Sequence, residues 1–259
     1  MQWFDAGANL LDGRFDIPLV LDNALQAGVT RICLITTAPD EWEAARELYQ
    51  QYPDQLCYTL GVHPHNARLA SDDDLTRLAH LAGEPGVVAI GECGLDFNRN
   101  FSEPAVQIQV FNAQLAIAKR LNMPVYLHER DAFQQQLTCL NQCPPVGGIA
   151  HCFTGTQQQM QAYLEFDLYI GITGWVCDPK RGEALQQAVS QIPADRLILE
   201  TDAPYLFPKN LRPRKRNNEP ANIPAIAEKV AELTGRDLAQ LSEQSYANTL
   251  ALFRLLAEV

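Results

Sequence analysis

The chain has 259 residues, of which 47% are hydrophobic and 20% are charged, and its net charge is −11. This composition excludes a disordered chain, and the negative charge excludes a protein that coats nucleic acid nonspecifically through Lys and Arg. The first residues lack the basic and apolar segments of a secretion signal, and no stretch reaches the roughly 20 apolar residues that span a bilayer. We therefore expect a cytoplasmic protein that has no membrane partner.

Short segments rich in Val, Ile and Leu alternate along the chain with longer segments of helical period, which is typical of parallel strands joined by helices. Eight segments are predicted to be strands: Trp3 to Asn9, Arg31 to Thr36, Cys57 to Val62, Val87 to Gly91, Val125 to Leu127, Gly148 to Ala150, Tyr169 to Ile172, and Leu197 to Glu200.

Helices are predicted between these strands and after the last one. The segment Ala105 to Leu121 has a single apolar face, which consists of Val106, Phe111, Leu115, Ala118 and Leu121. Pro124 is predicted to end this helix. Two more helical segments, Ile223 to Thr234 and Asp237 to Leu256, close the chain.

Eight strand and helix units, with strands too apolar for a sheet that faces water, favour a closed (β/α)8 TIM barrel. About 250 residues commonly form one such barrel, so residues 1–259 are predicted to be a single domain. No glycine fingerprint for a dinucleotide follows the first strand, which disfavours an open doubly wound sheet.

Potential metal ligands lie within one or two residues of the C-terminal ends of the predicted strands. They are Asn9, His63, His65, Glu92, His128, His151 and Asp202. In a parallel barrel these ends share one rim, so side chains far apart in sequence are expected to meet there. Imidazole and carboxylate ligands together suit divalent cations such as zinc, manganese and magnesium. For Glu200 and Asp202, a salt bridge inside the barrel is the alternative role.

A basic segment follows the last predicted strand of this acidic chain: Lys209, Arg212, Arg214, Lys215 and Arg216. Its place on the rim predicts that Arg212 and Arg214 contact substrate phosphates, with a solvated loop as the alternative. Arg130 is expected to contact phosphate beside His128. Trp175 and Phe97 are candidates for stacking on bases, although rim aromatic residues also serve simply to pack.

Five motifs distributed over essentially the whole chain resemble the TatD family of metal-dependent deoxyribonucleases, within the amidohydrolase-like barrels. They are Gly61-Val-His-Pro-His65, Gly91-Glu-Cys-Gly-Leu-Asp-Phe97, Pro124-Val-Tyr-Leu-His128, His151-Cys-Phe-Thr-Gly155 and Glu200-Thr-Asp-Ala-Pro-Tyr205. Further segments are similar to the branch of the family that consists of bacterial 3′–5′ exonucleases.

The resemblance implies a magnesium-dependent 3′–5′ exonuclease for single-stranded DNA or RNA, with a part in DNA repair. It implies that Glu92, His128 and His151 bind the metal and that Asp202 is a ligand or a base, so Glu92 and Asp202 are the catalytic candidates. His63 and His65 would then face the scissile phosphate. We expect a metal-activated water to attack the phosphodiester, Mn²⁺ or Zn²⁺ as alternative ions, and a monomer.

The first predicted strand departs from the family pattern. Family members commonly end it with Asp-x-His-x-His, whereas this chain has Asp5-Ala-Gly7-Ala-Asn9. With two imidazoles missing, we expect one tightly held ion and a second, weaker one. Two other functions stay open: a metal-dependent hydrolase of esters or of D-aminoacyl-tRNA, and a non-catalytic barrel that binds metal or nucleic acid.

Overall fold

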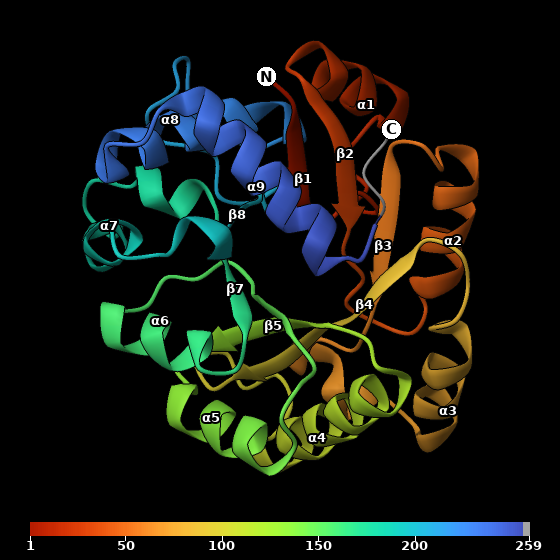
Figure 1. Ribbon diagram of the computed structural model, residues 1–259. Coiled ribbons are helices and arrows are strands. Elements are labelled where there is room, and N and C mark those ends of the chain that lie inside the picture. The colour runs from red at the N-terminus through yellow and green to blue at the C-terminus, as the bar shows by residue number, and fades with distance from the viewer. Residues whose placement is uncertain (256–259) are drawn as a thin grey trace. The chain divides into compact units, whose positions relative to one another are not determined.

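The structure is a computed structural model, and it describes residues 1–255 (Figure 1). Eight strands belong to one sheet, in which the strand order follows the chain order, and this confirms the predicted TIM-barrel class. The strands are β1 (Trp3–Ala8), β2 (Val29–Leu34), β3 (Leu56–Leu60), β4 (Val87–Asp96), β5 (Val125–Arg130), β6 (Gly148–Ala150), β7 (Leu168–Ile172) and β8 (Leu197–Leu199).

Helices follow the strands in alternation, and two long helices follow the last strand. They are α1 (Ile17–Gln26), α2 (Trp42–Gln51), α3 (Asp72–Leu81), α4 (Pro104–Leu121), α5 (Phe133–Gln142), α6 (Gln157–Leu164), α7 (Glu183–Val189), α8 (Ile223–Thr234) and α9 (Leu238–Leu252). Short 3₁₀ helices are η1 (Pro64–Leu69), η2 (Gly174–Cys177), η3 (Ala194–Arg196) and η4 (Pro220–Asn222). None of the helices within residues 1–255 has both the length and the apolar composition needed to cross a membrane.

The chain divides into two compact units, which we describe separately. The central unit consists of Leu34–His151 with Phe166–Leu168 and contains strands β3 to β6. These four strands are parallel, and residues Gly94 and Asp96 of β4 pair with His128 and Arg130 of β5. Because paired residues of parallel strands are neighbours, this register brings the functional ends of β4 and β5 together.

Helix α4 covers β4 in the central unit, and its buried face differs from the predicted one. Leu121 was expected to be buried, but it is exposed. Gln107 and Gln114 are buried instead, because their amides bond to the backbone of neighbouring segments. The helix ends at Leu121, and the following Asn122 adopts a left-handed conformation with φ of 55°, which stops the helix before Pro124.

The terminal unit consists of Met1–Cys33, Cys152–Glu165 and the described residues from Tyr169 onward. Within it β7 pairs with β8, β1 lies beside β8 through a parallel bridge between Ala8 and Ala203, and α9 packs on β1 and β8. Helix α8 has the predicted bounds and ends before Gly235, whose φ is 67°. Helix α9 ends at Leu252, earlier than predicted, and the predicted end at Leu256 lies outside the described residues.

Candidate active site

His63 follows β3 and stands at the start of the 3₁₀ helix η1. Its backbone is extended, as the following Pro64 favours, and its Nδ1 accepts a hydrogen bond from the backbone N–H of His65 at 3.1 Å. A neutral imidazole whose Nδ1 accepts carries its proton on Nε2. Burial lowers the pKa of His63 to about 3, so the ring is neutral near pH 7 and Nε2 is a donor.

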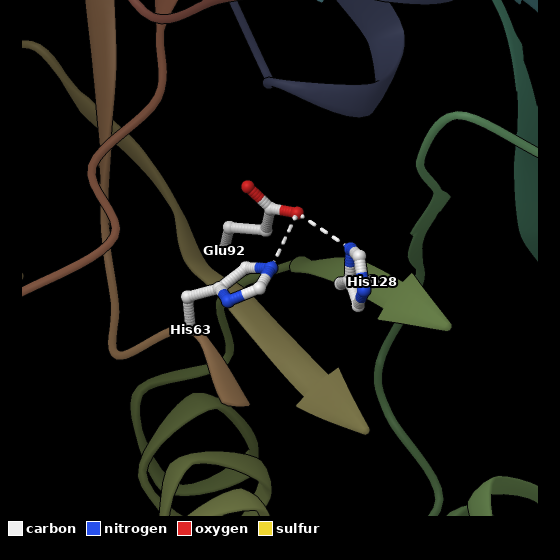
Figure 2. A group of neighbouring side chains, drawn as sticks. All are labelled: His63, Glu92 and His128. Atoms are coloured by element: carbon white, nitrogen blue, oxygen red, sulfur yellow. Dashed lines mark hydrogen bonds and ion pairs between the residues drawn. The ribbon is translucent and has the colours of Figure 1, made fainter. Parts of the chain in front are cut away.

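Glu92 lies inside β4 and is surrounded by imidazoles. Its Oε1 accepts a hydrogen bond from Nδ1 of His128 at 2.9 Å, and Nε2 of His63 lies 3.5 Å from the same oxygen (Figure 2). Nε2 of His151 lies 3.8 Å from it. Burial alone would raise the pKa of Glu92, but His63, His151 and the bond from His128 hold that pKa well below its usual range. Glu92 is therefore an ionised, buried carboxylate.

His128, in β5, has one ring nitrogen without a hydrogen-bond partner. Its Nε2 is buried and lies 3.5 Å from Oδ2 of Asp96, whereas Nδ1 is bonded to Glu92. Burial alone would lower the pKa of His128, but the carboxylates of Asp96 and Glu92 raise it to about 9. The ring is therefore protonated near pH 7 when no metal cation is bound beside it.

Asp96 ends β4 and is a site residue to which the sequence analysis gave no role. Its carboxylate is 1% exposed, and Oδ2 lies 2.6 Å from Nε2 of His65. Oδ1 accepts hydrogen bonds from the backbone N–H groups of Asn98 and Arg99. Burial alone would raise the pKa of Asp96, but the nearby charge of His128 and the bond from His65 hold this pKa well below its usual range. A second ionised carboxylate thus lies beside the Glu92 cluster.

His151 follows β6, and Tyr126 of β5 orients its ring. The hydroxyl of Tyr126 and Nδ1 of His151 are 2.8 Å apart, and the tyrosine ring is fully buried. The ring tautomer with its proton on Nδ1 donates to this hydroxyl and leaves Nε2 available to a cation. Tyr126 therefore fixes which edge of the His151 ring faces Glu92.

Buried glutamines hold the strand ends that carry these residues. Gln114 of α4 bonds both to the backbone N–H and to the carbonyl of Val62, next to His63. Gln107 of α4 bonds in the same two ways to Asp96, and Gln136 of α5 accepts from the N–H of Leu95. Because each amide satisfies backbone groups at these strand ends, these segments have fixed positions.

Asp202 lies in the terminal unit, on the segment after β8. Its Oδ1 accepts a hydrogen bond from Nδ2 of Asn9 at 3.0 Å, and its N–H donates to the carbonyl of Gly7. Asp202 has a φ of 54°, a conformation that costs energy for a residue with a side chain. The ends of β1 and β8 thus fix the Asp202 carboxylate, and Asn9 acts here as a hydrogen-bond donor.

The other predicted site residues lie in loops or at strand ends. Glu200 is buried, and its Oε1 accepts from the N–H of Cys152 at 2.5 Å. Arg130, Arg212 and Arg214 are exposed, and Nη1 of Arg212 donates to two carbonyls of its own loop. Phe97 and Trp175 are half-buried.

Known proteins match this architecture over nearly the whole chain. The family model for the TatD related DNases matches residues 4–254. The chain belongs to the TatD family. Among curated TatD proteins, the "3'-5' ssDNA/RNA exonuclease TatD" of Erwinia billingiae is 48% identical over 258 residues, which cover 97% of this chain and 99% of that protein. The protein of the same name from Citrobacter rodentium is 47% identical, with coverage of 96% and 97%.

Two solved structures of TatD proteins show the same barrel. The TatD family hydrolase of Entamoeba histolytica has a TM-score of 0.90 at 26% identity and covers 99% of both chains. The TatD homologue YJJV of Escherichia coli also has a TM-score of 0.90, at 27% identity and with coverage of 97% and 98%. These likenesses confirm the predicted fold, and the family model with the curated relatives confirms the predicted class of metal-dependent nuclease.

The side chains of the TatD central unit fit a divalent cation. Ligand atoms of His63, Glu92 and His128 lie within 4.8 Å of one another. Nε2 of His128, which has no hydrogen-bond partner, and the ionised carboxylates of Glu92 and Asp96 are ligand atoms that such a cation prefers. His63 is the least suited of the group, because its Nε2 carries a proton. This proton suits the phosphate-facing role that the sequence resemblance implies.

Sequence reasoning found five of the side chains that meet in the central unit, but it gave no role to two others. His63, His65, Glu92, His128 and His151 are brought together there. Asp96 is separated from Glu92 by an even number of positions on one strand, so the sequence already indicated that both side chains point to the same face. Tyr126 is likewise two residues from His128 on a strand, which was a weaker indication that it belongs to the site.

Proposed function

We propose that this TatD-family chain is a metal-dependent 3′–5′ exonuclease that removes nucleotides from single-stranded DNA and RNA. The observation that carries the proposal is the cluster around Glu92, where three imidazoles face one buried carboxylate oxygen and Nε2 of His128 lacks a hydrogen-bond partner. The curated relatives named 3′–5′ ssDNA/RNA exonucleases support the substrate and the polarity.

Glu92, His128, His151 and Asp202 are the proposed metal ligands, with Mg²⁺ as the first candidate and Mn²⁺ or Zn²⁺ as alternatives. When bound, such an ion neutralises charge on the phosphate and lowers the pKa of water. Asp96 joins Glu92 in supplying the negative charge that attracts a cation. The bond from Nδ1 of His128 to Glu92 keeps Nε2 of His128 directed away from Glu92.

The remaining polar side chains act on the substrate. Nε2–H of His63 donates to a phosphate oxygen, and its low pKa keeps it a neutral donor over the whole physiological range. His65 binds the same phosphate while Asp96 orients its ring. Asp202 takes the proton of the attacking water, and Asn9 holds the carboxylate in position for this.

Exposed cations and half-buried aromatic residues bind the rest of the strand. Arg130, Arg212 and Arg214 contact backbone phosphates, and Trp175 and Phe97 stack on bases. The internal bonds of Arg212 to the carbonyls of Lys209 and Leu211 restrict where its guanidinium can reach.

Digestion of end-labelled single-stranded oligonucleotides by metal-stripped protein, refilled with Mg²⁺, Mn²⁺ or Zn²⁺, tests this proposal. We expect stepwise shortening from the 3′ end that requires metal and disappears in His128→Ala. His80→Ala is the matched control, because His80 is an exposed histidine of α3. No shortening with any ion, together with cleavage of an aminoacyl ester, would select the ester hydrolase instead. Tight binding without turnover would select the non-catalytic barrel.

The single domain, the monomeric state, the cytoplasmic location and the part in DNA repair stay predictions. Sedimentation of the purified chain tests the monomer, and fractionation of cells tests the location. Sensitivity of a deletion strain to DNA damage tests the role in repair.

A further inference from the structure

A buried carboxylate in the terminal unit joins two cations from different loops. Asp178, which follows η2, is 2% exposed, and its Oδ2 accepts from Nε of Arg181 at 2.8 Å and from Nζ of Lys209 at 2.5 Å. Burial alone would raise the pKa of Asp178, but Lys209 and Arg181 hold it well below its usual range. Two positive charges therefore converge on one negative charge, and the group keeps a net positive charge.

An indole lies directly beside this ion pair. The guanidinium carbon of Arg181 is 4.4 Å from the centroid of the Trp175 ring, and the indole N–H of Trp175 donates to the carbonyl of Arg181. The side chain of Arg181 is 59% exposed and that of Lys209 is 35% exposed. The stacked pair thus combines a cation with an aromatic surface, and both cations can reach a ligand from solvent.

The backbone around these side chains is tightly fixed. The N–H of Gly182 donates to the carbonyl of Asp178, and the hydroxyl of Thr173 accepts from the N–H of Trp175. A Cβ at Gly174 would collide with the carbonyl of Leu206, so only glycine allows the η2 segment to approach the loop after β8 this closely. The cations are therefore positioned before any ligand arrives, which reduces the entropic cost of binding.

We propose that Arg181 and Lys209, positioned by Asp178, bind a backbone phosphate of single-stranded nucleic acid, and that the adjacent base stacks on the Arg181–Trp175 pair. This inference rests on the proposed function, from which the ligand class, single-stranded nucleic acid, is taken. Paired cations are the groups that hold a phosphate, and a guanidinium backed by an indole is a surface on which any base can stack. Asp178 is a positioning residue, because it acts through Arg181 and Lys209.

Binding of a fluorescent oligonucleotide of about ten nucleotides to the metal-free protein tests the subsite without cleavage. Arg181→Gln and Lys209→Gln should each weaken binding about tenfold and reduce the slope of log affinity against log salt by about 0.7. Lys180→Gln removes one charge from the same loop, where Lys180 gives only its backbone N–H to Asp178, and should change binding much less.

An abasic oligonucleotide separates stacking from charge. Arg181→Lys keeps the charge but loses the planar group, so it should weaken binding of the normal strand several-fold and leave binding of the abasic strand unchanged. Thermal unfolding of each variant checks that the fold is intact. Equal losses of oligonucleotide affinity in the Lys180, Arg181 and Lys209 variants would overturn the subsite, because they would indicate nonspecific electrostatic attraction. Unchanged affinity in the Arg181 and Lys209 variants would also overturn it.

Turnover of bis(4-nitrophenyl) phosphate, a diester that has no neighbouring backbone phosphate and no base, distinguishes this proposal from the proposed function. The subsite variants should keep wild-type turnover of this diester while losing oligonucleotide affinity. Normal oligonucleotide binding with no metal-dependent shortening would overturn the exonuclease and retain the subsite. Loss of diester turnover in Arg181→Gln and Lys209→Gln would overturn the subsite, because it would place their effect at the reaction centre.

Discussion

Nδ1 of His63 accepts a hydrogen bond from the backbone N–H of His65, and this bond determines what the other side of the ring can do. The proton of the neutral imidazole lies on Nε2, which faces Oε1 of Glu92 at 3.5 Å. His63 is thus a neutral hydrogen-bond donor whose Nε2–H lies beside the Glu92 carboxylate.

Replacing His63 should reduce turnover and leave the metal in place. We expect His63→Ala to lower kcat about 10²- to 10³-fold, the loss typical of removing one donor to the developing charge. Steady-state kinetics and metal analysis of the same preparation measure both effects. A variant that loses the metal would show instead that His63 is a ligand.

Metal affinity should rise with pH because His128 must lose a proton to bind a cation. Its pKa of about 9 means that the metal-free protein holds this proton at neutral pH. We expect affinity to increase about tenfold per pH unit below about pH 9 and to level off above it. Calorimetric titration across this range, in buffers of different ionisation enthalpy, counts the released proton. A flat profile would contradict the assignment of His128 as a ligand.

Asp96 should matter as much as a recognised ligand. Asp96→Asn keeps the shape of the side chain but removes the charge that faces His65 and His128, and we expect metal affinity to fall about 10- to 100-fold. Asp72→Asn on α3 is the matched control, because Asp72 is exposed. Equal metal affinities of wild type and Asp96→Asn would remove Asp96 from the site.

Asp202 should affect the chemical step more than metal binding if it is the base. Asp202→Ala is expected to lower kcat about 10²- to 10⁴-fold while the protein retains its metal. Asn9→Ala should give a smaller loss in the same direction, since Asn9 only orients the carboxylate. Pre-steady-state digestion under single-turnover conditions measures the step directly, and unchanged turnover in Asp202→Ala would end the base role.

Asp5 should make the protein less stable as the pH rises towards neutrality. It is fully buried, and burial raises its pKa to about 7 despite bonds from Thr201 and Gly7. The folded protein then binds the proton more tightly than the unfolded chain, so this group stabilises fully below about pH 4 and loses that contribution as the pH rises through about 7. The loss is at most about 4 kcal/mol.

Asp5→Asn measures this contribution. An amide can accept from the same backbone N–H groups and donate to the Thr201 hydroxyl. Because it does not titrate, the free energy of unfolding of the variant should not show the decrease between low pH and neutral pH that Asp5 causes in the wild type. Urea unfolding of both proteins at several pH values gives the comparison. Parallel stability curves for wild type and variant would show that Asp5 titrates normally.

The sequence could predict the strand-end residues because parallel strands impose a simple rule. His63, Glu92, His128 and His151 each follow or end an apolar segment, and the rule that such ends meet needs no coordinates. The same reasoning ended β4 at Gly91, whereas the strand continues to Asp96. Its register with β5 shifts between Ile90 and Cys93, and no sequence pattern predicts such an irregularity.

Contacts between distant segments could not be predicted from the pattern of single segments. Gln107 and Gln114 were not part of the expected apolar face, and only the folded chain shows the backbone groups that they satisfy. Lys209 was grouped with its basic neighbours in sequence, but its ammonium group bonds to Asp178, 31 residues away. Pairings of this kind depend on tertiary structure.

The hydrogen bonds that orient the imidazoles of the cluster join residues that all lie in the continuous segment from Leu34 to His151. Gly7 and Asn9, where this chain departs from the family pattern, belong to the other unit and take no part in those bonds. Substitutions at Gly7 and Asn9 therefore remove none of these hydrogen bonds. We therefore expect the residues that end the first strand to vary among relatives more readily than the imidazoles around Glu92.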